Sequence, residues 1–378
     1  MTESTSASAP RRQRAMPFAH TAGGIAAIGV KELRGRMRGR RAFIILTIYL
    51  LLLAGFALMV ETLVERSFTT GFGGASAMAS SVIGQSIFAA ILLLMTLQVV
   101  FLAPSSAAGA ISLEREKQTL ELLIATPISS VAIVVGKLLS TLVYVFLLIA
   151  ASIPLMAVVF VYGGVAPEDV LRGYIVLLVT ALGLGSFGLF CSSLVKRTTA
   201  ATAVTIFGVL AMTIGTAFVL IFWTAMGTFD NNGNRVGGPF GMRAPAVLGY
   251  INPFIAQADV LCGTGSSFGS FWCSGVQALV PSDQGVIFTN GGVVEPVPMA
   301  EPAIDGRKGV AFDGNDQVIN DVAPAQPFGA GRDAVWTKSV VTWLILSVVF
   351  LGLSVQSVSP TRRWRLRRGR RGPGSPTP

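Results

Sequence analysis

The chain has 378 residues, of which 52% are hydrophobic and 13% are charged, and its formal net charge is +10. An ordinary soluble domain is about a quarter charged, so this chain lacks the polar side chains that would cover a water-facing surface. Its composition therefore excludes a typical soluble domain and favours a membrane protein.

The basic excess could indicate a nucleic-acid partner, but it is concentrated in "KELRGRMRGRR" and "RRWRLRRGRR", which lie directly beside apolar segments. Basic residues in that position are attracted to anionic lipid headgroups. We therefore expect the lipid bilayer, and no nucleic acid, as their partner.

Two segments precede the first apolar stretch. Residues 1–16 are polar and are expected to form a disordered tail, and residues 17–41 are expected to form a basic interfacial helix. In this helix Val30, Leu33 and Met37 share one face. The opposite face carries the basic residues Lys31, Arg34, Arg38 and Arg41. Such a helix lies along the inner membrane surface, although a solvated basic linker is an alternative.

Six apolar segments are long enough to cross about 30 Å of hydrocarbon, which takes about 20 helical residues. In lipid, each backbone N–H and C=O must find a partner within its own segment, so each span is a helix. The sequence thus predicts an all-α membrane protein with six transmembrane helices. The expected spans are 42–60, 81–103, 138–162, 174–195 and 198–226, all within 42–226, and a sixth over 339–358, within 339–360.

The orientation follows from the distribution of the 29 Lys and Arg residues. Most of them lie in alternate segments between the spans, namely 1–41, 103–137, 196–197 and 361–378. Basic residues in short flanking segments stay on the cytoplasmic side. Both termini, including a basic tail over 361–378, are therefore predicted to be cytoplasmic in a multi-pass protein of the plasma membrane.

The segment 227–338, between the fifth and sixth spans, is a long external loop or lobe rich in Gly, Pro, Asn and Asp. Cys262 and Cys273 both lie in it and can form a disulfide outside the cell, or stay as two free thiols. The apolar stretch 249–261 is too short to span. It is either an interfacial or re-entrant helix, or part of the packing of the external lobe.

The sequence offers little for catalysis. The interiors of the spans carry no Asp, Glu, Arg or His, and Lys137 stands at the mouth of the third span. Intramembrane hydrolases, proton-relay transporters and metal pumps usually place ionisable groups at that depth. Gly136-Lys137 resembles the end of a nucleotide-binding P-loop, but Leu138 follows where Ser or Thr is needed. His20 is the only histidine, so no metal site is expected. Because the spans lack ionisable groups and the P-loop match fails, no cofactor or catalytic residue is expected either.

The most polar interruption is "EREKQTLELLIATPIS", residues 114–129, between the second and third spans. Leu113, Leu120, Leu123 and Ile124 form one apolar stripe of a predicted helix over 112–126, and charged residues form its other flank. Thr126 can cap the next helix, and Pro127 suits its first position. The alternative is an ordinary amphipathic connector on the membrane surface.

This segment resembles the hallmark of the permease subunits of ABC-2-type ATP-driven exporters, an acidic and basic run followed by T-L-E-L-L-x-x-T-P-x-S and then G-K. The matching residues are Thr119, Leu120, Glu121, Leu122, Leu123, Thr126, Pro127, Ser129, Gly136 and Lys137. "KELRGRMRGRRAFIILTIYLLLL" also resembles the beginning of these permeases. The resemblance covers roughly 28–225 and the last span, whereas many relatives have a shorter connection than 227–338.

The resemblance implies a six-helix permease half that moves an unidentified substrate out of the cell. Two copies of a separate ABC ATP-binding subunit would supply the energy, and a second permease copy or a homologous permease would complete the transporter. The helix over 112–126 would be the coupling helix that docks on the ATPase. Its docking residues would be Glu114, Arg115, Glu116, Lys117, Leu120, Glu121 and Leu123, with Thr126 and Pro127 turning the chain back.

Two other classes of function remain as alternatives from the sequence. A membrane enzyme would use polar groups of the external lobe, and a membrane scaffold or anchor would only hold that lobe at the surface. Neither alternative requires an ATPase partner.

Overall fold

The computed structural model describes residues 40–71, 79–118, 130–226, 228–229, 235–237, 245–262, 276, 279, 311–312, 318–319 and 334–358. The interfacial segment before residue 40, the segment 119–129, most of 227–338 and the basic tail lie outside these residues. Lys31, Arg34 and Arg38 are among the residues outside. Arg41 belongs to the first helix, but its side chain is not described.

Six helical segments in the described part of the chain are long and apolar enough to cross a membrane, which confirms the all-α architecture. Three of the spans are interrupted or extended by short elements. The elements in order are α2 (Arg40–Gly71), α3 (Ala79–Ala108), α4 (Ser112–Glu116), α6 (Ser130–Ala151), α7 (Ile153–Met156), α8 (Val159–Tyr162), α9 (Pro167–Leu194), α10 (Thr198–Leu210), the π-helix η1 (Ala211–Gly215), α11 (Thr216–Ala225), α12 (Ala246–Ile251), α13 (Pro253–Cys262) and α15 (Val335–Val358).

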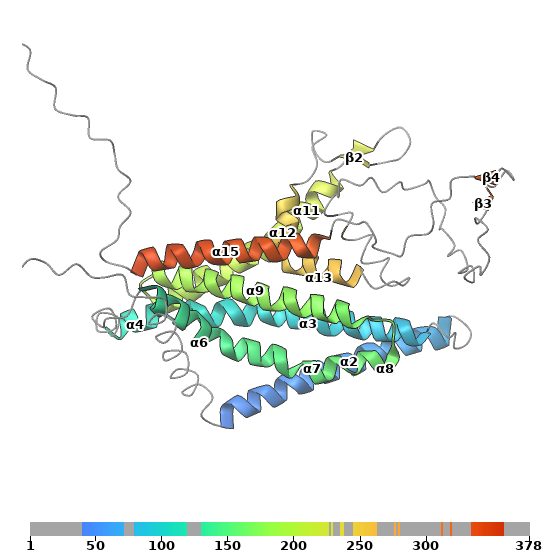
Figure 1. Ribbon diagram of the computed structural model, residues 1–378, viewed down its shortest axis with the longest axis horizontal. Coiled ribbons are helices and arrows are strands. Elements are labelled where there is room, and N and C mark those ends of the chain that lie inside the picture. Colours follow the sequence, from blue (N-terminus) through green and yellow to red (C-terminus); the bar gives the residue numbers. More distant parts are fainter. Residues whose placement is uncertain are drawn as a thin grey trace, which may run out of the picture.

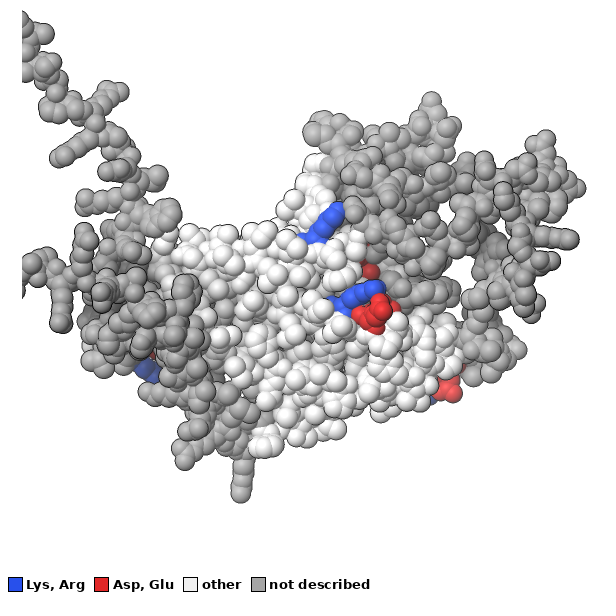
Figure 2. All heavy atoms as spheres, in the orientation of Figure 1, with Lys and Arg blue, Asp and Glu red and all other residues white. Residues whose placement is uncertain are grey.

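Successive spans run antiparallel, and α9 lies at the centre of the bundle (Figure 1). It packs against α3, α15, α6, α10 and α13. Its small residues allow this close approach, because a Cβ on Gly188 would lie 2.5 Å from the carbonyl oxygen of Pro104 in α3. Charged side chains lie toward the two ends of the bundle, and the belt between them is uncharged on the visible face (Figure 2).

The third span is broken near Pro154. The helix α6 ends at Ala151, and the short helices α7 and α8 continue the span. Proline has no backbone N–H to donate and its ring disfavours a continuous helix, so the break occurs where the sequence places this residue. The buried hydroxyl of Ser152 lies 2.8 Å from the hydroxyl of Tyr174 in α9, and this hydrogen bond holds the break against the central helix.

The stretch 249–261, for which the sequence left two interpretations open, forms parts of α12 and α13. These helices pack against α15, and α13 also contacts α9 and α3. The amide of Asn252, between them, donates to the Thr213 carbonyl at 2.8 Å and to the Thr216 hydroxyl at 3.1 Å. The stretch therefore packs against the transmembrane helices at the end of the bundle opposite α4 (Figure 1), and both interpretations stay open.

The only β structure in the described residues consists of two short antiparallel pairs. The strand β1 (Thr228–Phe229) pairs with β2 (Arg235–Gly237), and β3 (Ala311–Phe312) pairs with β4 (Val318–Ile319). Both pairs belong to the segment between the fifth and sixth spans, so the membrane region itself is helical.

Candidate functional site

The helix α4 follows α3 after a three-residue turn and lies at the end of the bundle where α6 begins (Figure 1). It ends early, because Gln118 adopts a φ of 57°, a conformation that an α-helix cannot contain. The structure thus places a helix over the first five residues of the predicted 112–126 helix. Leu120, Glu121, Leu123, Thr126 and Pro127 lie outside the described residues.

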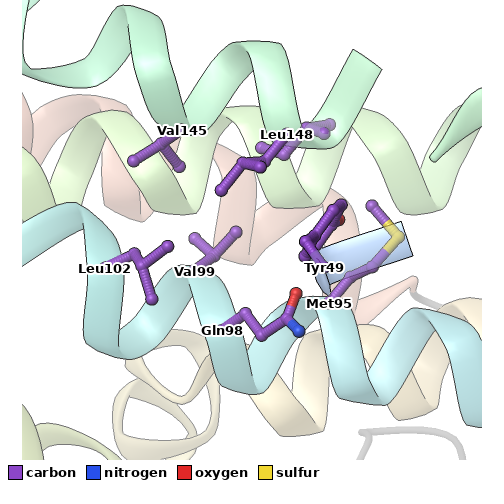
Figure 3. A pocket seen from close by; sticks show the side chains of 8 residues that line it. Tyr49, Met95, Gln98, Val99, Leu102, Val145 and Leu148 are labelled. Carbon is purple, nitrogen blue, oxygen red and sulfur yellow. The ribbon is translucent and has the colours of Figure 1, made fainter. Parts of the chain in front are cut away.

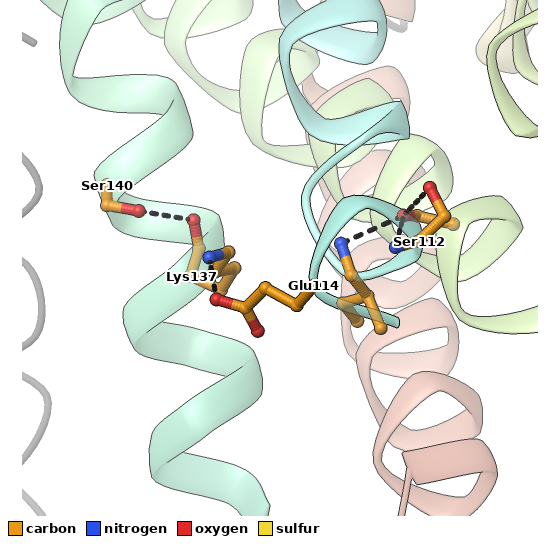
Figure 4. Close-up of polar contacts among 6 residues, drawn as sticks. Ser112, Glu114, Lys137 and Ser140 are labelled. Atoms are coloured by element: carbon orange, nitrogen blue, oxygen red, sulfur yellow. Dashed lines mark hydrogen bonds and ion pairs between the residues drawn. The ribbon is translucent and has the colours of Figure 1, made fainter. Parts of the chain in front are cut away.

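The first attachment of α4 is an ion pair with the third span. Lys137 Nζ in α6 lies 2.5 Å from Glu114 Oε1 (Figure 4). The Lys137 side chain is 11% exposed and the Glu114 side chain is 23% exposed, so both charges are largely removed from water. Removing one partner of such a pair leaves the other charge poorly solvated, which makes the pair a strong constraint on the position of α4.

The second attachment joins α4 to the central helix. Ser192 Oγ in α9 accepts hydrogen bonds from the backbone N–H groups of Ile111 and Ser112, both at 3.0 Å. The first N–H groups of a helix have no partner within that helix, and α4 has no side-chain cap of its own. A fully buried serine eighty residues further along the chain supplies this cap.

The third attachment joins α4 to the fifth span. Glu116 Oε1 accepts a hydrogen bond of 2.8 Å from the backbone N–H of Thr198, and Oε2 lies 3.1 Å from the Thr198 hydroxyl. Thr198 is the first residue of α10, whose own N-cap residue, Arg197, makes no side-chain cap. A carboxylate at this position satisfies free N–H groups and interacts favourably with the helix dipole.

The remaining described charges at this end are mostly positive. Among the described residues, Arg115 and Lys117 of α4 and Lys196 and Arg197 before α10 take part in no salt bridge. Lys117, Lys196 and Arg197 are exposed, and Arg115 is half-buried. Glu114 is neutralised by Lys137, whereas the exposed Glu116 is bonded to the uncharged Thr198, so the balance of the described charges at this end is positive.

A small pocket lies deeper in the bundle, between α2, α3 and α6 (Figure 3). Its lining residues are Tyr49, Met95, Gln98, Val99, Leu102, Val145, Leu148 and Ile149. Gln98 Oε1 is buried and has no hydrogen-bond partner among the described residues. One amide and one phenol in an apolar pocket provide neither a nucleophile nor an acid–base pair, so the pocket has no evident catalytic chemistry.

The two remaining predictions concern cysteines and metals. Cys262 is disulfide-bonded, and the buried Cys191 is free. Cys273 lies outside the described residues, so its pairing with Cys262 stays a prediction. The described residues contain no group of three or more His, Cys, Asp or Glu side chains that could hold a metal ion.

The sequence singled out Glu114 and Glu116 as docking residues and Lys137 as part of the family motif, but it predicted no partners for them within the chain. It also missed Ser192 and Thr198, which hold α4 from the other spans. Ser192 and Thr198 are small polar residues of ordinary kinds within or beside apolar segments, and no spacing pattern distinguishes them. Only the contact with α4 gives them a role.

Comparison with known proteins agrees with this architecture. A family model described as "ABC-2 family transporter protein" matches residues 26–257, which is more than half of the chain. The matched region contains every described element from α2 to α12 and half of α13, including α4. No curated protein matches the chain.

Proposed function

The chain belongs to the ABC-2 family of transporter proteins and is a membrane permease of an ABC transporter, and we propose that it exports its substrate with energy from a separate ATP-binding subunit that docks at α4. The complete transporter would contain two ATP-binding subunits and a second copy of this permease or a homologous one. It would lie in the plasma membrane, and this chain would carry no catalytic residue of its own.

The observation that carries the proposal is the triple attachment of α4. Within a few residues, α4 is joined to the third, fourth and fifth spans through Glu114, Ser112 and Glu116. A force applied to α4 from outside the membrane would therefore reach three spans at once. Small displacements at an effector site are passed on in this way when packed elements have two discrete arrangements.

The structure also refines the proposed docking residues. Glu114 and Glu116 have partners within the chain, so we assign them to holding α4 against the bundle. Arg115 and Lys117 are left to contact the ATP-binding subunit, which would offer acidic residues to them. Leu120, Glu121, Leu123, Thr126 and Pro127 remain proposed parts of the docking segment.

This assignment implies an orientation. The end of the bundle that carries α4 would face the cytoplasm, and α2 begins and α15 ends at the same end (Figure 1). Both termini would then be cytoplasmic, with Lys31, Arg34, Arg38 and Arg41 beside the inner headgroups. The segment 227–338 would lie outside the cell.

The test is co-expression of the full chain with the ATP-binding subunit encoded beside it, followed by affinity purification. We expect the wild-type permease to co-purify with the ATPase. The double variant Arg115→Glu/Lys117→Glu should reduce co-purification at least tenfold, because it reverses two charges at the proposed contact. The matched control is Arg172→Glu, at the opposite end of the bundle, which should co-purify like the wild type.

Two results would overturn the proposal. One is a wild-type permease that carries no ATP-binding subunit through purification. The other is a double variant that binds the ATPase and stimulates its ATP hydrolysis as the wild type does, which would remove α4 from the interface.

A further inference from the structure

We propose that Glu116 is a positioning residue that couples α4 to the fifth span, and that this link acts separately from the Glu114–Lys137 pair that couples α4 to the third span. The inference rests on the proposed function, because it concerns how a displacement of α4 reaches the membrane. It assigns the two glutamates of α4 to different spans.

The geometry of Glu116 suits a coupling contact. Both carboxylate oxygens are used, with the Thr198 N–H on one and the Thr198 hydroxyl on the other. Two bonds to one residue fix the direction of the contact as well as its length. The carboxylate is also negatively charged at the N-terminus of a helix, where the helix dipole favours it.

The helix α10 packs against α3 and α9, but it has few other polar attachments at this end. Val195, Lys196 and Arg197 form the whole connection to α9, and the backbone at Val195 and Arg197 is extended. Among the described residues outside α10 and this connection, Glu116 is the one that makes polar contacts with the first turn of α10. A displacement of α4 would therefore act on the start of the fifth span directly.

The fifth span is also lightly packed, so it can respond. Only 28% of its most apolar stretch is buried inside the protein, compared with 72% for the fourth span. Phe207 in α10 is 75% exposed, and Phe218 in α11 is 66% exposed. Segments with few buried apolar contacts are the ones that move at low cost.

The middle of the same span has a second defined contact. The π-helix η1 interrupts it, and Asn252 occupies the backbone carbonyl of Thr213 there. π-Helical turns within α-helices are frequent at functional sites. Asn252 also caps α13 through its side-chain oxygen, 3.0 Å from the Phe254 nitrogen. The fifth span is thus bonded to α4 at its start and to Asn252, between α12 and α13, near its middle.

The contact with α6 is of a different kind. Glu114 and Lys137 form a largely buried ion pair, whereas Glu116 is exposed at the end of the bundle. The third span is also better packed, with 39% of its apolar stretch buried. The two glutamates can therefore be separated by experiment.

The test is hydrogen exchange measured by mass spectrometry on the permease–ATPase complex in lipid nanodiscs, with and without ATP and vanadate. In the wild type, we expect nucleotide trapping to change exchange in the peptides that cover the first turns of both α6 and α10. Glu116→Ala should abolish the nucleotide-dependent change at α10 and keep the change at α6. Glu114→Gln is the matched control and should have the reverse effect.

A purely structural role would give a different result. Loss of an N-cap alone should raise exchange of the first α10 amides about fivefold, equally with and without nucleotide. The coupling role predicts that the difference between the two states disappears. Glu116→Gln, which keeps one acceptor oxygen, should restore part of that difference.

The possible outcomes separate this inference from the proposed function. The coupling role of Glu116 is wrong, and the docking of α4 stands, if the wild-type complex assembles and nucleotide trapping changes hydrogen exchange in α6 but not in α10. The same conclusion follows if Glu116→Ala keeps the wild-type change in exchange at α10. If nucleotide trapping changes hydrogen exchange in neither helix, both this inference and the proposed function fail. If Glu116→Ala does not assemble, Glu116→Gln decides by the same measurement, and a full wild-type response at α10 in that variant overturns the inference.

Discussion

The fourth and fifth spans are neighbours in sequence and in space, yet they are held in the protein by different means. The helix α9 is held by packing, since 72% of its apolar stretch is buried and small residues bring it against α3 and α15. The span formed by α10, η1 and α11 has 28% of its apolar stretch buried, and hydrogen bonds from Glu116 and Asn252 hold it at two positions. Packing resists displacement over a whole surface, whereas hydrogen bonds at two points fix a helix only at those points. The comparison indicates a fixed central helix beside a movable one.

The strongest test of the fixed helix is Gly188→Leu. A Cβ at this position would already meet the Pro104 carbonyl oxygen at 2.5 Å, and backbone cannot move aside as a flexible side chain can. Overpacking a core costs roughly 1–3 kcal/mol and sometimes more, and the leucine also adds three further carbons. We expect loss of most of the folded permease, measured as the monodisperse fraction in detergent by size-exclusion chromatography.

The matched control is Gly352→Leu in α15, where no atom lies within 4 Å of the position of a new Cβ. It should purify like the wild type. Equal yields from the two variants would mean that α9 is not held by close packing, and the comparison between the spans would lose its basis.

A smaller effect is expected at the second tie of the fifth span, from Asn252→Asp. The aspartate keeps an oxygen for the cap of α13 but loses the N–H that reaches the Thr213 carbonyl. The Thr213 carbonyl keeps the Thr216 N–H and hydroxyl as donors, so the variant loses one buried hydrogen bond, which contributes about 0.5–1.5 kcal/mol. We expect a lower thermal unfolding midpoint and faster exchange in the peptide that covers η1.

Asn252→Ala provides the control for this prediction, because it removes both contacts and should lower the midpoint further. If the aspartate variant exchanges at η1 as slowly as the wild type, the amide of Asn252 does not hold the π-helix, and the fifth span would have one tie only.

The smallest effect is expected from Phe207→Ala in α10. The side chain is 75% exposed in this chain, so its removal creates no cavity, and exposed substitutions usually change stability by less than about 0.5 kcal/mol. The thermal midpoint should not change. Trp343→Ala in α15, a residue 1% exposed, is the contrasting variant and should cost about 3–5 kcal/mol.

Phe207→Ala also tests whether a second permease copy covers this face. If Phe207→Ala lowers the mass of the purified permease assembly, as measured by light scattering, this face is covered by another chain. The light packing of the fifth span would then belong to the isolated chain and not to the assembly.

The sequence by itself determined the membrane class, the six spans and the polar segment that begins with Glu114, and Pro154 explains the break that the structure shows in the third span. These features depend on local properties, because a run of about 20 apolar residues, a proline without an N–H, or a charged stretch acts on its own segment whatever the rest of the chain does. The family resemblance from 114–140 was likewise readable from residues that are adjacent in the chain, and the family match confirms it.

The tertiary structure alone decided which partners the polar residues have. Glu116 meets Thr198 eighty-two residues away, Ile111 meets Ser192 eighty-one residues away, and Asn252 meets Thr213 thirty-nine residues away. Such pairs depend on which helix ends come together in the bundle, and that is set by the packing of small residues on α9 against its neighbours. The sequence could therefore place the charges of α4 at the membrane surface, but the fold determined that its two glutamates contact separate spans.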